Sequence, residues 1–315
     1  MRVLVTGANG LVGRRLCGHL TALGVAVRAV VRDGGASKLS GDCVRVGDLG
    51  ASTSWHEALS GVDTIVHLAA RVHVMNDDAA DPLAAFRQVN VAATLNLARQ
   101  AVSAGVRRLV FVSTVKVNGE HTAPGQVFAE HDIPAPQDPY AISKWEAEQG
   151  LWAIVRDTGL ELVIVRPPLV YGPGVRANFA ALVRWVQRGW PLPLAAVHNA
   201  RSLVALDNLV DFLSICLSHP AAANQLFLVS DGEDKSTADL VRGIAHALRR
   251  PPRLVALPVW TLQLAGRLTG RAHVIDRLCA NLQLDIHKAR QRLQWEPRIT
   301  VAEGLRRTIS IETPA

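Results

Sequence analysis

The chain has 315 residues, of which 49% are hydrophobic and 19% are charged. This balance predicts a folded globular protein with one large core, or a core and a smaller lobe, and argues against disorder. The formal net charge is +7. The basic residues are nevertheless dispersed along the sequence, and the densest groups, Arg249-Arg250-x-x-Arg253 and Arg306-Arg307, have no interleaved aromatic residues. We therefore expect no nucleic-acid partner and interpret the charge as an attraction for anionic small molecules such as nucleotides.

Cysteine usage and the apolar runs bear on location. The four cysteines lie far apart without the spacing of metal ligands, so no metal site is predicted, and reduced thiols fit the cytoplasm. A strand at residues 2–5 leaves no room for a signal peptide. The uncharged run Leu254–Gly266 contains Pro258 and is too short to span a bilayer, which favours a buried or interfacial helix. The sequence predicts a cytoplasmic protein without a membrane span.

The first half of the chain alternates short β-branched runs with longer amphipathic stretches. Strands are predicted at 2–6, 25–31, 43–47, 63–67, 107–113 and 160–165, with helical stretches such as Gly13–Leu23 and Pro82–Ala104 between them. Strands rich in Val and Leu that alternate with helices indicate a parallel sheet covered on both faces. We therefore expect an α/β fold with a doubly wound parallel (Rossmann) sheet, and a dinucleotide-binding domain at residues 1–171.

Beyond Tyr171 the pattern changes. Residues 172–200 are rich in loops around one helix near 176–188, and an apolar strand at Leu226–Val229 is expected to return to the sheet within residues 202–233. Residues 234–315 are helical, with breaks at prolines 251, 252, 258 and 297. Residues 172–315 are therefore predicted to form mainly a smaller C-terminal substrate lobe.

A glycine-rich loop follows the first strand and opens a helix. Gly7 suits the tight turn, Gly10 allows a pyrophosphate to approach the backbone, and Gly13 lets the helix pack close to the strand. The free N–H groups at the helix start attract phosphates. We expect this loop to bind the cofactor pyrophosphate through Gly7, Asn9, Gly10, Leu11, Val12 and Gly13.

The end of the second strand bears on the choice between NAD and NADP. An NAD site would place an acid there, but Val31 occupies that position and Arg32 follows. Arg32 is expected to pair with a 2′-phosphate, which predicts NADP(H) preference with NAD(H) possible, although a surface arginine is the alternative. Asp48, followed by Leu49, is expected near the adenine, unless it only caps a turn. The small residues of Leu68-Ala69-Ala70 would let the backbone pass close to the cofactor.

Tyr140 and Lys144 lie four residues apart, hence on one helix face. A nearby ammonium and a positively charged nicotinamide would lower the pKa of the phenol. Tyr140 would then exchange a proton with a reacting oxygen, while Lys144 bonds the nicotinamide ribose. Thr114, or less favourably Ser113, follows a strand and would orient that oxygen. Together with the glycine loop, these residues predict hydride-transfer chemistry.

These residues belong to a wider set of motifs. TGANGLVG at Thr6–Gly13, HLAA at His67–Ala70, Asn90-Val91-x-x-Thr94, Ser113-Thr114, Tyr140/Lys144 and Arg166-Pro167 resemble the extended short-chain dehydrogenase/reductase (SDR) family over nearly the whole chain. Many members act on nucleotide-linked sugars through a 4-keto centre, and most are cytoplasmic homodimers paired through two helices, which here would be 83–104 and 141–157.

The resemblance also implies further roles for single residues. Thr114 would contact the substrate oxygen, Pro167 would line the nicotinamide, and Asn90 would join the cofactor site. The segment Asn178-Phe179 resembles one that contacts a nucleotide diphosphate, and Arg201 resembles the arginine that binds that diphosphate, with a solvated arginine as its alternative. His73 would touch the sugar if it faces the cleft, although a surface histidine is as plausible.

Departures from the family patterns sharpen the functional prediction. Thr114-Val115-Lys116 lacks the two carboxylates of sugar dehydratases, and Leu169 replaces an asparagine of many 4-epimerases. Stretches such as Arg71-Val-His-Val-Met75, Pro191-Leu-Pro-Leu194 and Arg201-Ser-Leu-Val204 resemble bacterial enzymes of the UDP-N-acetylquinovosamine type. The resemblance therefore favours a 4-keto reductase of a UDP-linked 6-deoxy-N-acetylhexosamine in surface-polysaccharide (lipopolysaccharide) synthesis.

Three alternatives stay open. The first is a UDP-hexose 4-epimerase with tightly bound NAD, which runs the same half-reaction twice. The second is an NADPH reductase of a small apolar ketone, since related reductases resemble Val27-Arg-Ala-Val-Val-Arg32. The third is a non-catalytic NADP sensor, which the retained Tyr140/Lys144 pair disfavours.

Overall fold

The computed structural model describes residues 1–32, 41–72 and 81–310 and is built around one large parallel sheet. Its seven strands lie in the order β3-β2-β1-β4-β5-β6-β9, and every neighbouring pair is parallel. The strands are β1 (Arg2–Thr6), β2 (Ala26–Arg32), β3 (Asp42–Val46), β4 (Thr64–His67), β5 (Arg108–Val112), β6 (Glu161–Arg166) and β9 (Gln225–Leu228). The strand order reverses direction between β1 and β4, which is where doubly wound folds bind dinucleotides.

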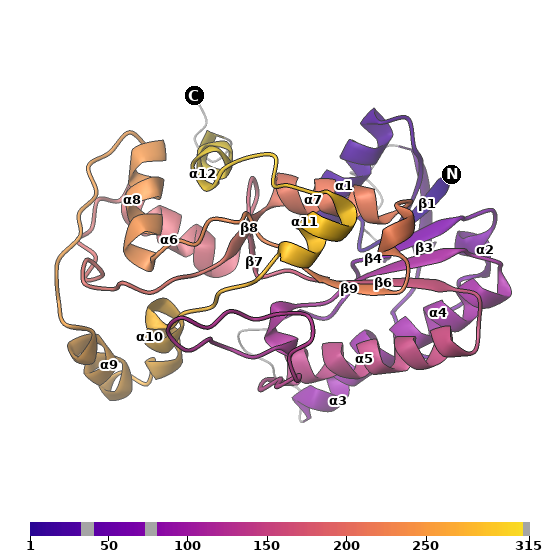
Figure 1. Cartoon of the computed structure of the whole chain (residues 1–315), viewed down its shortest axis with the longest axis horizontal. Helices are drawn as coiled ribbons and strands as arrows, with labels where there is room; N and C mark the ends of the chain where they lie inside the picture. The colour runs from indigo at the N-terminus through magenta and orange to yellow at the C-terminus, as the bar shows by residue number, and fades with distance from the viewer. Residues whose placement is uncertain (33–40, 73–80, 311–315) are drawn as a thin grey trace.

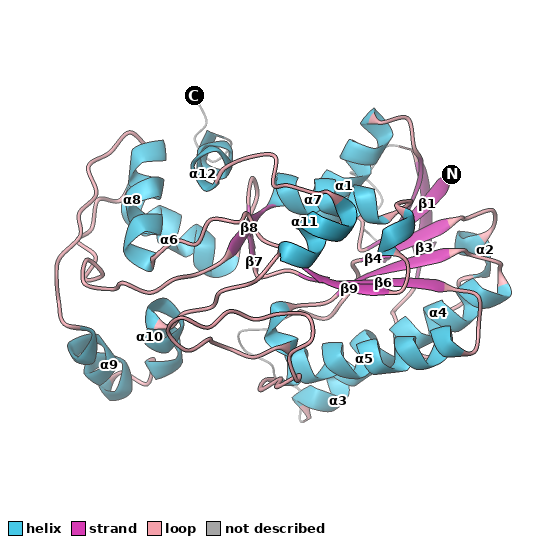
Figure 2. Cartoon of the chain, viewed as in Figure 1, coloured by secondary structure: helices cyan, strands magenta, loops and turns pink. Residues whose placement is uncertain are grey.

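Helices cover both faces of this sheet (Figures 1 and 2). The packed clusters of buried side chains place α1 (Leu11–Ala22), α7 (Leu206–Cys216) and α11 (His287–Leu293) on one face. The other face carries α2 (His56–Leu59), α4 (Ala93–Ser103) and α5 (Pro139–Arg156). Because both faces are buried, the central strands consist of apolar runs rather than alternating patterns.

A smaller lobe extends from the carboxyl end of the sheet and has its own apolar core. The two-stranded parallel ribbon of β7 (Leu169–Tyr171) and β8 (Leu203–Ala205) lies where the lobe joins the sheet. The helices that contribute to this lobe are α6 (Ala177–Gln187), α8 (Thr237–Ala247), α9 (Val259–Leu268), α10 (Ala272–Cys279) and α12 (Val301–Ser310). Buried side chains of α6, α8 and α12 form the centre of its core.

The predicted fold class is confirmed, and the seven strands of the large sheet lie within two residues of the predicted ones, whereas β7 and β8 were not predicted. The helical stretch expected at Pro82–Ala104 is divided into α3 (Pro82–Arg87), a π-helical turn η2 (Gln88–Ala92) and α4. Within residues 172–315, which the sequence assigns mainly to the lobe, α7, β9 and α11 pack with the sheet. Among the helices described, none is both long and apolar enough to cross a bilayer.

Candidate active site

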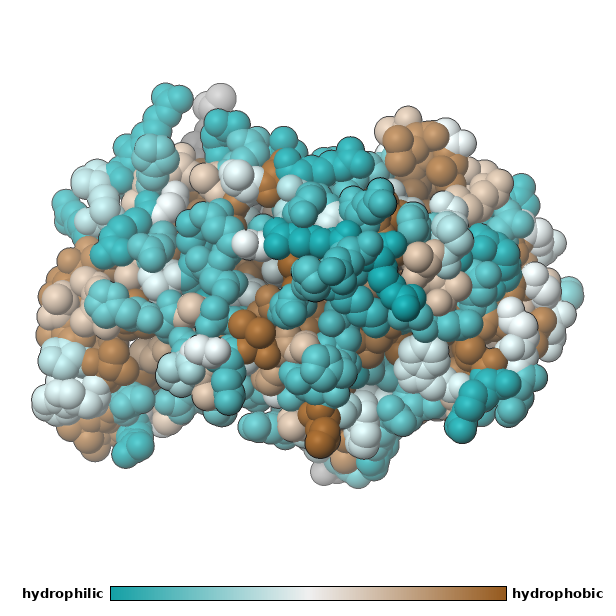
Figure 3. All heavy atoms as spheres, viewed as in Figure 1, coloured by the Kyte–Doolittle hydropathy of each residue, from teal (hydrophilic) through white to brown (hydrophobic). Residues whose placement is uncertain are grey.

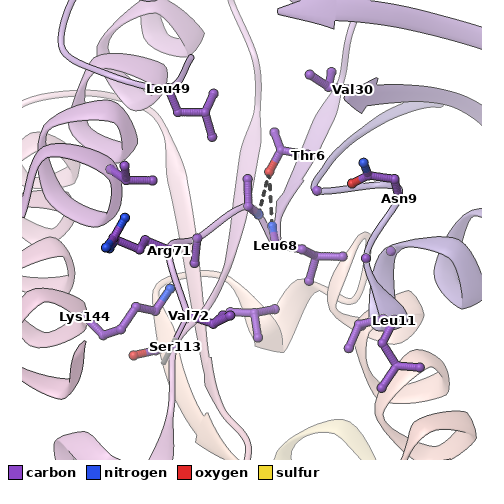
Figure 4. A pocket seen from close by; sticks show the side chains of 18 of the residues that line it. Thr6, Asn9, Leu11, Val30, Leu49, Leu68, Arg71, Val72, Ser113 and Lys144 are labelled. Carbon is purple, nitrogen blue, oxygen red and sulfur yellow. Dashed lines mark hydrogen bonds between the residues drawn. The ribbon is translucent and has the colours of Figure 1, made fainter. Parts of the chain in front are cut away.

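A cavity of about 950 Å³ lies at the carboxyl ends of the central strands. Its lining comes from the β1–α1 loop, the ends of β2, β4 and β5, and the start of α5. Figure 4 shows side chains from these separate segments turned toward one space, with Asn9 and Leu11 on one side and Lys144 and Ser113 toward one end. Of the residues predicted to bind a cofactor, all except Asn90 line this cavity.

The glycines of the β1–α1 loop are required by close backbone contacts. Gly7 has φ +65°, and a Cβ on it would lie 2.9 Å from the backbone nitrogen of Ala69. A Cβ on Gly13 would lie 2.2 Å from the carbonyl oxygen of Gly7, which is far inside van der Waals contact. The amide of Gly10 donates to the same Gly7 carbonyl at 2.9 Å, closing the turn. The loop therefore has no space for side chains at the positions where the sequence has glycine.

This loop fits the pyrophosphate of a dinucleotide. Gly10 is the N-cap of α1 and has no side chain to satisfy the first N–H groups of the helix. These donors therefore remain available to an anion and carry the positive end of the helix dipole. Leu11 and Val12, the first residues of α1, line the cavity beside Asn9. Gly7, Gly10 and Gly13 thus form a cradle shaped for phosphate oxygens.

Thr6 and His67 hold the opposite wall of the cavity in place. The hydroxyl of Thr6 accepts hydrogen bonds from the amides of Leu68 and Ala69, both at 3.1 Å (Figure 4). The same hydroxyl lies 2.7 Å from Nδ1 of His67, whose Nε2 lies 2.9 Å from the hydroxyl of Thr94. Burial, together with the charge of Lys144, lowers the pKa of His67 to about 3, so the ring is neutral. The residues 68–70 are therefore fixed by a neutral buried network.

The part of the cavity where the sequence predicts the adenosine is lined by Val31, Arg32, Asp48, Leu49 and Trp55. Val31 is buried in the core, whereas Arg32 is exposed at the end of β2. Among the described residues that line the cavity, Asp48 is the only carboxylate. The end of β2 therefore has the buried Val31 where a diol-binding acid would stand, followed by the exposed cation of Arg32.

Lys144 is the buried cation among the residues predicted to be catalytic. Its side chain is 2% exposed, and its ammonium lies 3.9 Å from the centre of the Phe111 ring. Burial lowers the pKa of Lys144 to about 7, and the charge of Glu148 opposes this shift. An ammonium held in this way gains from any polar ligand atom, such as a ribose hydroxyl, that enters the cavity beside it.

Tyr140 lies one helical turn before Lys144 and also lines the cavity. Desolvation and the charge of Asp138 raise the pKa of its phenol to about 12. The predicted lowering by Lys144 is therefore absent in the protein alone, because burial outweighs any attraction from that ammonium. The phenol is protonated at neutral pH, so a lower pKa at this position would require the positive charge of a bound nicotinamide.

Thr114 and Ser113 differ in what their hydroxyls do. Thr114 lines the cavity, and its side-chain oxygen accepts a 3.3 Å bond from the amide of Lys116. The hydroxyl of Ser113 donates to the buried carboxylate of Glu148 at 2.5 Å. Of the two hydroxyls, that of Thr114 is therefore the better placed to orient a substrate oxygen, as the sequence also favours.

Glu148 and Arg166 form a buried ion pair behind the catalytic group that the sequence did not reveal. Their side chains are 1% and 3% exposed, and the two guanidinium contacts to the carboxylate measure 3.0 and 2.5 Å. Arg166 also donates to Asn118 at 2.9 Å. Glu148 follows Lys144 by four residues on α5, which is the signal that places both side chains on one helix face.

Other predicted residues lie away from the cavity lining. Asn90 is buried and bonds the backbone of Arg71 and the hydroxyl of Ser143. The Phe179 ring is buried in the lobe core and stacks on Tyr171, while Asn178 is exposed at the start of α6. His73 lies outside the described residues. Asn90 therefore supports the catalytic helix from behind rather than from within the cavity.

Arg201 lies in the lobe, outside the cavity lining. Its guanidinium donates to the carbonyls of Arg277 and Ala280 at 2.8 and 3.0 Å. Burial and the charge of Arg277 lower the pKa of Arg201 from its usual value, while Glu120 partly offsets this. Two guanidinium groups held near one another favour an anion, which is consistent with the predicted diphosphate contact.

The structure adds lining residues to which no role was assigned from sequence. Trp55, Arg71, Val72, Gln88 and Val89 all face the cavity. Trp55 belongs to a loop without a motif, and Gln88 and Val89 lie in the π-helical turn. Amphipathic periodicity did not distinguish them, because a π turn shifts which side chains face inward.

Comparison with known proteins identifies the class to which this fold and cavity belong. The model of the NAD dependent epimerase/dehydratase family matches residues 3–229. The chain therefore belongs to the NAD-dependent epimerase/dehydratase family, the extended SDR type, and is an NAD-dependent sugar epimerase or related oxidoreductase.

Individual relatives show which enzymes of this family the chain is similar to. A UDP-glucose 4-epimerase of Vibrio cholerae is 46% identical over 308 residues, covering 97% of this chain and 94% of that protein. An N-acetyl-alpha-D-glucosaminyl-diphospho-ditrans,octacis-undecaprenol 4-epimerase of Escherichia coli O157:H7 is 27% identical, covering 98% and 95%. The solved structure of MoeE5 in complex with UDP-glucose and NAD superposes with a TM-score of 0.79 at 25% identity, covering 99% and 98% of the two chains. Two of these relatives carry the name of a sugar 4-epimerase.

Proposed function

We propose that the protein is a UDP-hexose 4-epimerase that retains its nicotinamide cofactor through the reaction. The observation that carries this proposal is the 46% identity, over 97% of the chain, with a UDP-glucose 4-epimerase. The side chains of Thr114, Tyr140 and Lys144 line one cavity together, as the chemistry requires. This proposal replaces the 4-keto reductase favoured from sequence, for which the replacement of asparagine by Leu169 was one argument.

The residues of the cavity suit both halves of such a reaction. A bound nicotinamide supplies the hydride acceptor and donor. Tyr140 takes the proton of the sugar 4-hydroxyl and returns it to the same oxygen after the 4-keto sugar has presented its opposite face, while Thr114 orients that oxygen. Lys144 lies one helical turn from Tyr140, and its positive charge would stabilise the deprotonated phenol. Because the pKa of Tyr140 is about 12 in the protein alone, its phenolate, once formed, takes up a proton readily.

A dehydratase reaction is disfavoured because Val115 and Lys116 stand where sugar dehydratases have two carboxylates. Lys116 stands at one of those positions, and its ammonium contacts Glu120 at 2.8 Å and Asp138 at 2.5 Å. Asp138 in turn caps α5, since its carboxylate accepts from the amide of Ala141. Lys116 thus ties the end of β5 to the start of the helix that carries Tyr140, which is a structural role.

The epimerase proposal is tested with the purified protein and no added cofactor. Interconversion of UDP-glucose and UDP-galactose, or of the corresponding N-acetylhexosamines, is expected and is followed by chromatography of the UDP-sugars. A reductase would instead consume NAD(P)H stoichiometrically with a UDP-4-keto sugar, and an apolar ketone reductase would do so with a ketone lacking a nucleotide. The proposal would be overturned if the UDP-sugars are not interconverted and NAD(P)H is consumed with either the UDP-4-keto sugar or the apolar ketone.

The cofactor preference forms a separate part of the proposal. Arg32 and the absence of a carboxylate other than Asp48 in the described lining support a preference for NADP(H), whereas the MoeE5 structure is a complex with NAD. Release of the bound nucleotide by acid and its identification by mass spectrometry decides between them. Arg32→Ala is expected to lower the affinity for NADP(H) and to leave that for NAD(H) within about threefold. An equal loss of affinity for NADP(H) and NAD(H) would contradict a contact between Arg32 and the 2′-phosphate.

The assembly and the location complete the proposal. We propose a cytoplasmic homodimer that pairs through the α4 and α5 region, which forms the outer layer of one sheet face. The UDP-sugar would lie between Thr114 and Tyr140 on one side and Arg201 on the other. Light scattering during size-exclusion chromatography measures the mass, and a monomer at all concentrations would contradict the dimer.

A further inference from the structure

Helix α9 in the smaller lobe exposes a stripe of large apolar side chains. Trp260, Leu264 and Leu268 follow one another at four-residue spacing and are 65%, 50% and 80% exposed. The opposite face of α9 holds the helix in place, because Leu262 and Gly266 are buried, and a Cβ on Gly266 would lie 2.8 Å from Ile275 of α10. The stripe is therefore presented outward by a helix that is anchored through its other face.

The stripe is the centre of a larger apolar surface. Val255 and Leu257 before α9, and Val274 on α10, are 40–45% exposed. Six of the 14 exposed large apolar side chains in the described chain thus fall within residues 255–274. Figure 3 shows apolar atoms gathered at the end of the molecule where Figure 1 places α9. Such a concentration marks an interaction surface rather than scattered exposure.

The charges around this surface are almost all positive. Residues 249–279 contain six arginines, at positions 249, 250, 253, 267, 271 and 277, and Asp276 is the single acid. This segment has a net charge of +5, from six positive and one negative residue, out of +7 for the whole chain. No salt bridge within the described residues involves these arginines. Of these arginines, Arg267 lies on α9 and Arg271 and Arg277 lie at the start of and on α10, whereas Arg250 and Arg253 lie beside the end of α6.

We propose that residues 249–279, centred on the apolar stripe of α9, form a docking surface for an anionic lipid bilayer. An amphipathic helix with Trp and Leu on one face and arginines beside it matches the interface between acyl chains and negatively charged headgroups. A second copy of this chain is a poorer occupant, because a two-fold contact would bring the same net positive surface against itself. The stripe likewise disfavours nucleic acid, which offers no apolar surface along its phosphates.

The docking surface adjoins the substrate side of the molecule. Helix α10 packs against α9, and the backbone carbonyl of Arg277 on α10 accepts a hydrogen bond from Arg201. Bilayer contact would therefore place the candidate diphosphate site close to the headgroups. The proposal stands on α9 and its arginines and does not depend on which sugar the cavity binds.

The full-length protein with its bound cofactor is tested by sedimentation with vesicles of phosphatidylcholine, with and without phosphatidylglycerol. Binding is expected only with phosphatidylglycerol and should weaken at high salt. The double variant Trp260→Glu/Leu264→Glu should bind at least about tenfold more weakly. The variant Arg267→Glu/Arg271→Glu should lose roughly fivefold or more for each position. As a matched control, Leu23→Glu changes a 61% exposed leucine far from α9 and should bind like the parent protein.

Two results would overturn the proposal. One is parent protein that stays in the supernatant with anionic vesicles. The other is equal vesicle binding by the parent and both double variants. If the stripe variants instead lower the molecular mass in solution while vesicle binding is absent, the surface covers a second copy of this chain. Retained epimerase turnover and circular dichroism show that the variants are folded, because none of the changed residues lines the cavity.

Discussion

The cofactor side of the cavity and the smaller lobe that faces it are built in different ways. On the cofactor side, backbone contacts at Gly7 and Gly13 and the buried networks of His67 and Glu148 fix each position. In the lobe, Arg201 bonds backbone carbonyls, and α9 directs apolar side chains outward. Crowded, buried positions accept few residue types, whereas exposed ones accept many. The first region is therefore recognisable by its motifs, and the second only by its surface chemistry.

The largest effect on turnover is expected from removing the hydroxyl of Tyr140 on the cofactor side of the cavity. Tyr140→Phe should lower turnover roughly 10²- to 10⁴-fold, because the proton donor and acceptor is lost while the ring remains. The bound nucleotide should be retained. Tyr171→Phe is the control, since it removes the only other tyrosine hydroxyl, which bonds Asp231 at 2.7 Å outside the cavity. Comparable turnover loss in both variants, measured at equal folded fraction, would argue against a chemical role for Tyr140.

The buried ion pair should matter more than an exposed one on the same helix. Glu148→Gln leaves the charge of Arg166 buried without its partner and should lower the free energy of unfolding by about 3–5 kcal/mol. Glu146→Gln, which breaks the more exposed contact with Arg87, should lower the free energy of unfolding far less, because solvent screens that pair. Urea unfolding measures both. Adding Arg166→Met to Glu148→Gln should recover part of the loss, and no recovery would point to packing instead of charge.

The glycine contacts of the phosphate loop can be tested within one helix. Gly13→Ala should lower the free energy of unfolding by about 1–3 kcal/mol and weaken nucleotide retention, because its Cβ would press on the Gly7 carbonyl. Gly18→Ala adds a methyl group to the same helix, with no atom within 4 Å, and should stabilise by about 0.5–1 kcal/mol. Thermal unfolding and the nucleotide content of purified protein are the measurements. The two variants must change the free energy of unfolding in opposite directions, with a decrease for Gly13→Ala and an increase for Gly18→Ala.

The neutral histidine predicts a pH dependence of stability. The pKa of His67 is about 3 in the folded protein and 6.5 as its ordinary value. Between these values the unfolded chain binds the proton and the native protein does not, so stability falls as pH drops from 6.5 toward 3. His67→Gln should reduce this slope by up to about 1.4 kcal/mol per pH unit. His56→Gln, at an exposed position, should leave the slope unchanged in urea titrations across that range.

The smallest effect is expected in the lobe. Arg201→Lys should raise KM for the UDP-sugar roughly tenfold and change kcat less, because a point charge replaces the forked guanidinium. Arg242→Lys on α8 is the control, since that side chain forms an exposed pair with Asp239. A pure loss of kcat in Arg201→Lys would show that the lobe arginine serves the chemistry and not the nucleotide.

Sequence motifs predicted the cofactor side well because few side chains satisfy its constraints. Gly13 tolerates no Cβ, so its identity alone indicated the close approach of α1 to the loop. Tyr140 and Lys144 were paired by helical spacing. Glu148 was overlooked, although its spacing from Lys144 is the same, because its partners Ser113 and Arg166 come from the ends of β5 and β6 and meet it only in the folded chain.

By itself, the sequence determined the sheet, the phosphate loop and the Tyr/Lys pair, because periodicity, glycine sterics and helical spacing are local properties. The tertiary structure decided which of the remaining side chains are buried, which are exposed and which have shifted pKa values. It buried Phe179, raised the pKa of Tyr140, and placed Arg267 and Arg271 beside the exposed apolar stripe of α9. These outcomes depend on burial and on neighbours distant in the chain, since desolvation and charge act through space.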